Sequence, residues 1–271
     1  MTFTLLSLGH GYAGRATEAA LGPDWQVLGT SRRPGAAVLW PDDAAAALAR
    51  ATHLIAWAPP GPAGDPLLPG LLGLPAPRLR WIGYASASSL YGDTGGDWID
   101  ESAPDAPSTE RGLARQRAEA DWRAFATRHS VPLALLRIAG IYGPGRSVLD
   151  GLRLGTAQRV VKPGQVFNRI HATDLGRIAA ACAQTCLDGT IILADAEPAP
   201  QSEVIAFGAR LLGLSPPPEI PYESASLSPM AQSFYAENKR LRSRRIGPEL
   251  GLSLRYPTYR EGLAAILDAE S

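Results

Sequence analysis

The fold of this 271-residue chain is decided by Gly9-His10-Gly11-Tyr12-Ala13-Gly14, which places glycines at all three positions of the pattern G-x-G-x-x-G. The first glycine allows a tight turn, the second lets the backbone approach a pyrophosphate, and the third lets a helix pack on a strand. An apolar run at residues 3–8 precedes the pattern, and helix-compatible residues 12–21 follow it. The sequence therefore predicts a strand, a turn and a helix whose free N–H groups face the phosphates of a dinucleotide. An ordinary glycine turn is the alternative, because 28 glycines allow a chance match.

The alternation of strand and helix continues along the chain. Further strands are expected at 25–30, 36–40, 53–58, 80–85, 133–137 and 190–194, and helices at 42–51, 109–129 and 175–185. This order predicts an α/β fold, a Rossmann-type doubly wound parallel sheet. We expect residues 1–195 to form this dinucleotide-binding domain, with 142–167 crossing toward a second lobe. The proline-rich residues 196–271 are expected to form that smaller, substrate-side C-terminal lobe.

Composition excludes several classes of function. The formal net charge is zero, so no basic field attracts nucleic acid or an anionic membrane, and a small-molecule substrate is the expected partner of a monomer or homodimer. The four histidines and two cysteines stand at no metal-ligand spacing, so no metal site is expected. Cys182 and Cys186 suggest a reducing compartment, the cytoplasm. The first apolar run is too short for a signal peptide, and no segment is long enough to span a membrane.

The end of the second predicted strand indicates which dinucleotide is bound. NAD enzymes place an Asp or Glu there to hold the ribose 2′-hydroxyl, whereas this chain has Ser31-Arg32-Arg33. One hydroxyl and two guanidinium groups suit a 2′-phosphate. The sequence therefore favours NADP as the cofactor, with NAD as the alternative. Two solvated arginines on a surface turn are the structural explanation of the same residues.

Later blocks of sequence point to a family. With residues 9–14, the stretches 86–93 (SASSLYGD) and 136–146 (LRIAGIYGPGR) make the chain resemble the extended short-chain dehydrogenase/reductases, in particular their atypical, NAD-dependent epimerase/dehydratase-like branch. Residues 169–174, 239–251 and 256–259 resemble later blocks of that family, so the likeness covers nearly the whole chain. The motif and the resemblance together assign to the cofactor Gly9, Gly11, Tyr12, Ala13, Gly14, Ser31, Arg32, Arg33, Pro59, Ser86 and Gly140.

The same resemblance shows which catalytic residues are replaced. Active members carry a Ser or Thr four residues before the Tyr of the Tyr-Gly-Asp element, where this chain has Ala87. Counted back from Glu119, the Lys and Tyr of the family's Tyr-x-x-x-Lys correspond to Arg115 and Arg111. A guanidinium stays protonated near neutral pH and cannot act as a general acid or base. Arg115 is expected to contact the nicotinamide ribose as a cation, and Arg111 offers a fork for a carboxylate or phosphate of a substrate.

Other side chains are candidates for the missing proton donor. Tyr142 and Tyr91 follow predicted strands near the carboxyl edge of the sheet, where ligands bind, and each is also explained as a packed aromatic that holds a loop. Ser88 flanks the replaced position, and with Arg111 and Arg115 it completes the candidate catalytic set. The literal Tyr-x-x-x-Lys at residues 235–239 is expected to be a decoy in a solvated, Lys/Arg-rich helix.

Candidate substrate residues are Arg146, Arg169 and His171, the last of which is also explained as a buried structural histidine. Two functions remain open at this point. The first is an NADP-dependent reductase, epimerase or dehydratase that acts on a small oxygenated substrate, in which a relay supplies the proton. The second is a catalytically silent protein that senses the dinucleotide, because the usual catalytic set is missing.

Overall fold

Seven parallel strands form the central sheet of the computed structural model, which describes residues 2–33 and 35–270. Their order is β11-β7-β5-β4-β1-β2-β3. The strands are β1 (Phe3–Leu8), β2 (Trp25–Ser31), β3 (Val38–Leu39), β4 (His53–Ala56), β5 (Trp81–Ala87), β7 (Leu133–Ile138) and β11 (Gly189–Leu193). The chain runs outward from β1 in both directions, so the expected Rossmann-type doubly wound fold is confirmed.

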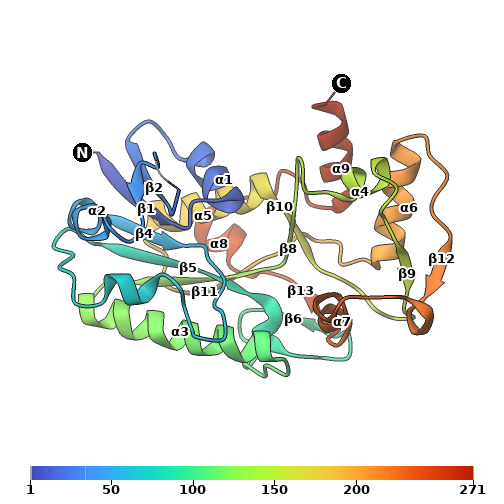
Figure 1. Ribbon diagram of the computed structural model, residues 1–271, viewed down its shortest axis with the longest axis horizontal. Helices are drawn as coiled ribbons and strands as arrows, with labels where there is room; N and C mark the ends of the chain where they lie inside the picture. The colour runs from blue at the N-terminus through green and yellow to red at the C-terminus, as the bar shows by residue number, and fades with distance from the viewer. Residues whose placement is uncertain (1, 34, 271) are drawn as a thin grey trace.

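Helices cover both faces of this sheet (Figure 1). The elements concerned are α1 (Tyr12–Ala20), α2 (Ala44–Arg50), α3 (Glu110–His129), α5 (Ala172–Thr185) and α8 (Ile246–Leu250). One apolar core joins α2 and α3 to the sheet, with Leu48 and Trp122 fully buried in it. A second core joins α5 and α8 to the opposite face, through Ile178 and Ile246. Helices therefore shield both faces of the central strands from solvent, which explains why β4 is buried at all four positions.

A smaller lobe lies beyond the carboxyl end of the sheet, at the right of Figure 1. Its elements are α4 (Val148–Arg153), β9 (Arg159–Val161), α6 (Gln201–Leu211), β12 (Glu219–Pro221), α7 (Pro229–Tyr235) and α9 (Tyr259–Asp268). Strands β9 and β12 pair in parallel, and a separate apolar cluster around Leu149, Val204 and Leu263 holds α4, α6 and α9 together. This lobe thus draws on segments before and after residue 195.

Two pairs of short strands lie where the chain passes between the sheet and the lobe. Strands β8 (Gly140–Tyr142) and β10 (Arg169–His171) pair in parallel where the chain leaves the sheet and returns to it. Strand β13 (Arg240–Leu241) pairs with β6 (Trp98–Ile99), and α8 then packs against the sheet. The C-terminal part of the chain is consequently divided between the lobe and the sheet. Within the described residues, no helix combines the length and apolar character needed to cross a membrane.

Candidate cofactor and substrate cleft

The turn between β1 and α1 has the geometry that its glycines predict. Gly9 has φ +69°, in the left-handed region that favours glycine. Its N–H donates to the Thr30 hydroxyl at 2.9 Å, and the His10 N–H donates to the Thr30 carbonyl at 3.2 Å, so β2 fixes the turn. Gly11 then stands at the N-cap of α1, where backbone N–H groups are free for an anion.

Gly11 and Gly14 are required for different reasons. A Cβ at Gly14 would lie 2.9 Å from His10 Nδ1, since the imidazole packs between α1 and the sheet and hydrogen-bonds Ser7 Oγ at 2.9 Å. A Cβ at Gly11 would meet only the Gly9 carbonyl oxygen, at 3.7 Å. The protein itself therefore leaves open the space that a side chain at Gly11 would fill. This opening at a helix N-terminus fits the pyrophosphate of a dinucleotide.

The residues expected to select NADP lie next to this turn, because they follow Thr30, which hydrogen-bonds Gly9 and His10. Ser31 ends β2, and its hydroxyl accepts the N–H of Arg33 at 3.1 Å. Arg32 and Arg33 are exposed, and neither forms an ion pair with another described residue. Both guanidinium groups are thus free to bind an anion beside the phosphate turn.

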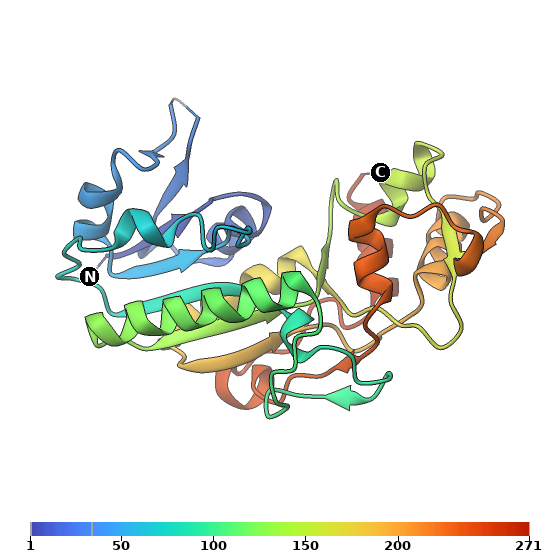
Figure 2. The same ribbon diagram turned by 60° about the horizontal axis from the view of Figure 1, so that its bottom comes forward.

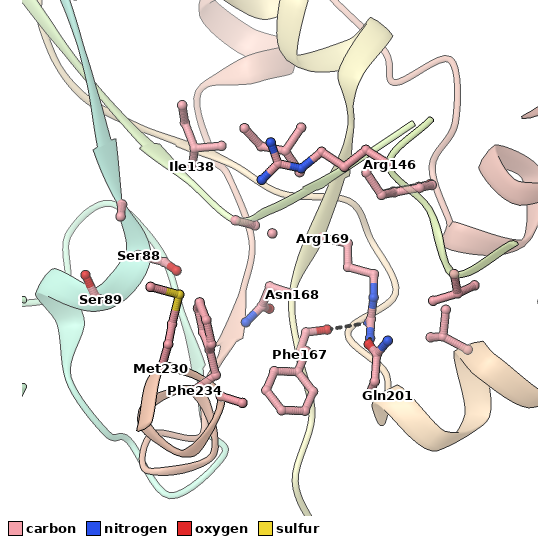
Figure 3. Close-up of a pocket in the computed structure, with 18 of the residues that line it drawn as sticks. Ser88, Ser89, Ile138, Arg146, Phe167, Asn168, Arg169, Gln201, Met230 and Phe234 are labelled. Atoms are coloured by element: carbon pink, nitrogen blue, oxygen red, sulfur yellow. Dashed lines mark hydrogen bonds between the residues drawn. The ribbon is translucent and has the colours of Figure 1, made fainter. Parts of the chain in front are cut away.

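A cleft of about 1080 Å³ extends from this turn, between the carboxyl ends of the strands and the lobe (Figure 3). Ala13, Pro59 and Gly140 line it near the dinucleotide turn. Its charged and polar side chains include Ser88, Arg111, Arg115, Arg146, Asn168, Arg169, Gln201, Glu237 and Lys239. Tyr12, at the start of α1, donates its hydroxyl to the Pro144 carbonyl at 3.1 Å, and the Arg146 guanidinium lies 5.8 Å from the Tyr12 ring centroid. The dinucleotide turn and the loop at residues 143–146 are therefore tied together.

The positions that replace the usual catalytic set do meet in this cleft. Ala87 and Ser88 line it at the end of β5, and Ser88 is half-buried with its side chain near α7 (Figure 3). Arg115 lines it from α3, and its Nη1 donates to the Ala85 carbonyl at 2.6 Å and to the Tyr84 hydroxyl at 3.1 Å. Arg115 therefore has a fixed position over the end of β5, as a cation without an acidic partner among the described residues.

Ser86 is committed to a buried ion pair. Its hydroxyl donates to Glu119 Oε1 at 2.6 Å, and Arg137 donates to the two oxygens of the same carboxylate at 3.1 and 3.0 Å. All three side chains are buried. The hydroxyl of Ser86 thus joins β5 to α3 and β7, and only other atoms of this residue face the cleft.

The two candidate tyrosines differ in their surroundings. Tyr142 lines the cleft, but it is 7% exposed and its hydroxyl donates to the Thr258 carbonyl at 3.3 Å. Burial raises the pKa of Tyr142 well above its ordinary value. Tyr91 is not among the residues that line the cleft; it is 2% exposed, and the Arg137 guanidinium lies 4.7 Å from its ring centroid. Both environments suit a packed aromatic that stabilises a loop.

Arg169 and His171 occupy the strand that returns to the sheet. Arg169 Nη1 donates to the carbonyls of Phe167 and Ala199, at 2.8 and 3.1 Å, and its Nη2 donates to Gln201 Oε1 at 2.7 Å. His171 Nδ1 accepts the N–H of Thr173 at 3.1 Å and so caps α5. Burial lowers the pKa of His171 to about 4, so the ring is neutral near pH 7. His171 does not line the cleft, and its contacts are those of a structural histidine.

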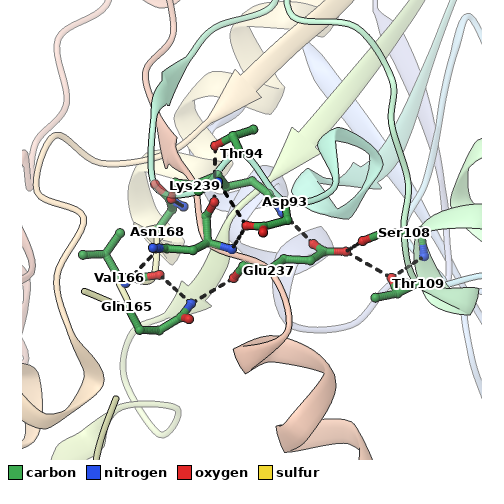
Figure 4. Close-up of polar contacts among 12 residues, drawn as sticks. Asp93, Thr94, Ser108, Thr109, Gln165, Val166, Asn168, Glu237 and Lys239 are labelled. Carbon is green, nitrogen blue, oxygen red and sulfur yellow. Dashed lines mark hydrogen bonds and ion pairs between the residues drawn. The ribbon is translucent and has the colours of Figure 1, made fainter. Parts of the chain in front are cut away.

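The segment after α7 differs from its sequence-based interpretation. Residues 235–239 were expected on a solvated helix, but α7 ends at Tyr235, and Glu237 and Lys239 are 8% and 6% exposed. Lys239 Nζ donates to Glu237 Oε2 at 2.6 Å, and Asn168 donates to the Lys239 carbonyl at 2.9 Å (Figure 4). Burial lowers the pKa of Lys239, and its partner opposes that shift. The expectation of a solvated helix is wrong, because residues from distant segments, such as Asn168, pack against Glu237 and Lys239 and bury them.

Comparison with known proteins agrees with this architecture. No family model matches the chain. The structure of a functionally unknown conserved protein from Silicibacter pomeroyi DSS is 41% identical over the whole of both chains, with a TM-score of 0.86. The structure of the human epimerase family protein SDR39U1 with NADPH has a TM-score of 0.78 and 20% identity, over 98% of this chain and 99% of that one. A 3-diazoavenalumate denitrifying reductase from Streptomyces sp is 29% identical over 182 residues, which span 61% of this chain and only 58% of that protein.

Proposed function

We propose, from the premise that this chain belongs to one family with the Silicibacter pomeroyi protein and has the fold of the epimerase/dehydratase-like short-chain dehydrogenase/reductases, that it is an NADP-dependent oxidoreductase acting on a small oxygenated molecule. The observation that carries the proposal is the open space at Gly11, at the N-terminus of α1 and two residues before Ala13, which lines the cleft. Bound in its reduced form, NADP supplies a hydride. Arg32 and Arg33 provide the charge for its 2′-phosphate.

The named properties of the relatives support the same class of function. The human epimerase family protein was solved with NADPH, and the Streptomyces relative is named a reductase. The reaction proposed is hydride transfer from the reduced cofactor. Arg115 would position the cofactor from its fixed place over β5, and a proton would reach the product through Tyr142, Ser88 or solvent in the open cleft.

The replacement of Gly11 by alanine tests cofactor binding without disturbing the fold. Gly11 has φ −104° and ψ −143°, outside the left-handed region and just beyond the ordinary β region, and its new Cβ would meet only one carbonyl oxygen at 3.7 Å. We expect Gly11→Ala to keep its thermal midpoint but to bind NADPH at least about 30-fold more weakly, or about 2 kcal/mol, in a fluorescence titration. Gly22→Ala is the matched control, because Gly22 has open space around it and lies outside the cleft. Unchanged NADPH affinity in Gly11→Ala would contradict the proposal, as would wild-type protein that binds neither NADPH nor NADH at millimolar concentration.

A dinucleotide sensor without turnover is the second candidate function. It is favoured by Ala87, Arg111 and Arg115 at the usual catalytic positions, and by the buried, hydrogen-bonded hydroxyl of Tyr142. NADPH oxidation should be screened with aldehydes, keto acids and sugars. Tight NADPH binding without turnover on the whole panel would favour the sensor, whereas turnover on any member would exclude it.

A further inference from the structure

Arg111 presents a desolvated cation to the substrate end of the cleft. It lies in the first turn of α3, at the end of that helix nearest the lobe (Figure 2). Its guanidinium carbon lies 4.1 Å from the ring centroid of Phe234. Burial lowers the pKa of Arg111, yet its guanidinium forms no hydrogen bond or ion pair with another described residue. A guanidinium carries five N–H donors, and those of the partly buried Arg111 have no hydrogen-bond partner among the described residues.

The neighbouring carboxylate is already occupied. Glu237 Oε2 accepts Lys239 Nζ at 2.6 Å, and Oε1 accepts the hydroxyls of Ser108 and Thr109 at 3.2 and 3.3 Å (Figure 4). Glu237 is also the only carboxylate among the described residues that line the cleft, against four arginines and one lysine. Glu237 attracts Arg111 at longer range, but its oxygens are bonded to other groups, so Arg111 has no direct ion-pair partner among the described residues.

A structural role for this cation is poorly supported. A positive charge in the first turn opposes the helix dipole, so Arg111 does not stabilise its own helix. The one side-chain contact recorded for its guanidinium among the described residues is with the Phe234 ring on α7, which is itself 47% exposed. The N–H groups of a guanidinium lie in its own plane and point away from a ring that faces it, so a planar carboxylate can still bind with two parallel hydrogen bonds.

The cover of the cleft beside Arg111 is apolar. Phe234 and Met230 extend from α7 toward Ser88, and both line the cleft although they are 47% and 71% exposed (Figure 3). Large exposed apolar side chains at the wall of a cleft favour a ligand with an apolar body. A ligand that fits this end thus joins an apolar body to a planar anion.

We propose that Arg111 anchors a carboxylate of the substrate and that Phe234 and Met230 cover the apolar part of the same molecule. This inference rests on the proposed oxidoreductase function and names the class of its substrate, an apolar or aromatic carboxylic acid. A phosphate is the competing anion, since Arg115 is a second cation near Arg111 while Lys239 is already paired with Glu237, and the phosphate probes below separate the two.

Binding of simple carboxylates to the NADP-saturated protein tests this assignment. The probes are cinnamate, phenylpyruvate and hexanoate, with cinnamamide as the neutral match and phenyl phosphate and UDP as other anions. By isothermal titration calorimetry, we expect at least one carboxylate to bind, and Arg111→Gln to weaken it at least about tenfold. Arg111→Lys keeps the charge without the fork and should fall in between. Arg117→Gln is the matched control, since Arg117 is exposed on the same helix and does not line the cleft.

A second variant keeps the test independent of the folding of the Arg111 variants. Phe234→Ala removes the apolar cover from an exposed helix and should weaken the aromatic carboxylates more than hexanoate. The inference is overturned if no carboxylate binds at millimolar concentration, if cinnamate and cinnamamide bind alike, or if phenyl phosphate or UDP binds more tightly than every carboxylate. Loss of NADPH affinity in Arg111→Gln would overturn it by assigning Arg111 to the cofactor. NADPH binding by the wild type is measured first. If the wild type does not bind NADPH, the proposed function is refuted rather than this inference.

Discussion

The two ends of the cleft are built from different parts of the polypeptide. The dinucleotide end uses backbone: Gly9, Gly11 and Gly14 shape a turn within six residues of sequence, and the open space at Gly11 is its main feature. The substrate end uses side chains, with Arg111 and Phe234 brought together from segments far apart in the chain. A backbone site leaves a local pattern of glycines, whereas a side-chain site depends on packing that no short pattern records.

The largest expected effect comes from breaking the backbone packing behind the dinucleotide turn. Helix α5 crosses α1 at Gly176, where a Cβ would overlap the carbonyl oxygen of Ala16. Gly176→Ala should therefore push α1 from its place and lower the free energy of unfolding by about 3 kcal/mol, the upper range for overpacking. Urea unfolding measures this, with Gly22→Ala as the control. An unchanged unfolding free energy would show that the backbone around the dinucleotide turn can shift, and would contradict the view that this end depends on fixed backbone positions.

The next effect probes a buried carboxyl group close to Arg169, which lines the cleft. Asp195 is 2% exposed, its Oδ2 has no hydrogen-bond partner among the described residues, and burial raises its pKa to about 8, although Arg169 opposes the shift. The unfolded chain loses this proton near pH 4, while the folded protein keeps it up to about pH 8. Because the folded state then binds more protons, its stability should decrease as the pH rises between these values.

Asp195→Asn should remove this pH dependence. The slope in the wild type is at most about 1.4 kcal/mol per pH unit, which corresponds to at most about 2.7 kcal/mol between roughly pH 5 and 7. Urea unfolding at several pH values in that range should show a flatter profile for the variant, with the two proteins most alike at the acidic end. Equal slopes in both proteins would contradict this assignment of the charge to Asp195.

Sequence was sufficient for the seven-stranded sheet and for the geometry of the glycine turn, but it did not predict the short strands β6, β8, β9, β10, β12 and β13. The predicted strands at residues 3–8, 53–58 and 133–137 and the helix at 109–129 are confirmed as β1, β4, β7 and α3, because runs of apolar residues and a Thr109 cap determine them locally. The glycine pattern likewise predicted the turn geometry. These features depend on neighbouring residues only.

Sequence was insufficient for the substrate end. The pattern at residues 235–239 was noticed but assigned to a solvated helix, because a Lys and a Glu are exposed in most contexts. Lys239 becomes buried only because Glu237 neutralises it and Asn168 fixes its backbone. Met230 and Phe234 gave no signal of their own, since exposed apolar residues acquire meaning only beside a cleft. Tyr91 was placed near the cleft by its strand, but its side chain packs away from the lining.

A smaller effect tests how much of the dinucleotide end depends on side chains. Arg32→Asp removes a cation and offers an acceptor for a ribose 2′-hydroxyl, so the ratio of NADPH to NADH affinity should fall about tenfold, or about 1.4 kcal/mol. Arg78→Asp is the matched control, because Arg78 is an exposed arginine ahead of β5, near the amino-terminal end of that strand, and does not line the cleft. An unchanged ratio in Arg32→Asp would show that Arg32 does not bind the 2′-phosphate.

The smallest effect concerns Tyr142. Its substitution tests whether this residue holds a loop in place or donates a proton. Its hydroxyl donates to the Thr258 carbonyl at 3.3 Å, and a Cβ at Gly262 would overlap this hydroxyl, so the group is enclosed by α9 and its cap. Tyr142→Phe should lose about 1 kcal/mol of unfolding free energy, the net value of one hydrogen bond, and should retain NADPH affinity. NADPH oxidation should also persist on any compound that the wild type reduces. A loss of turnover of about 100-fold or more with intact folding would identify Tyr142 as the proton donor, and the substrate end would then contain a family-like acid at a new position.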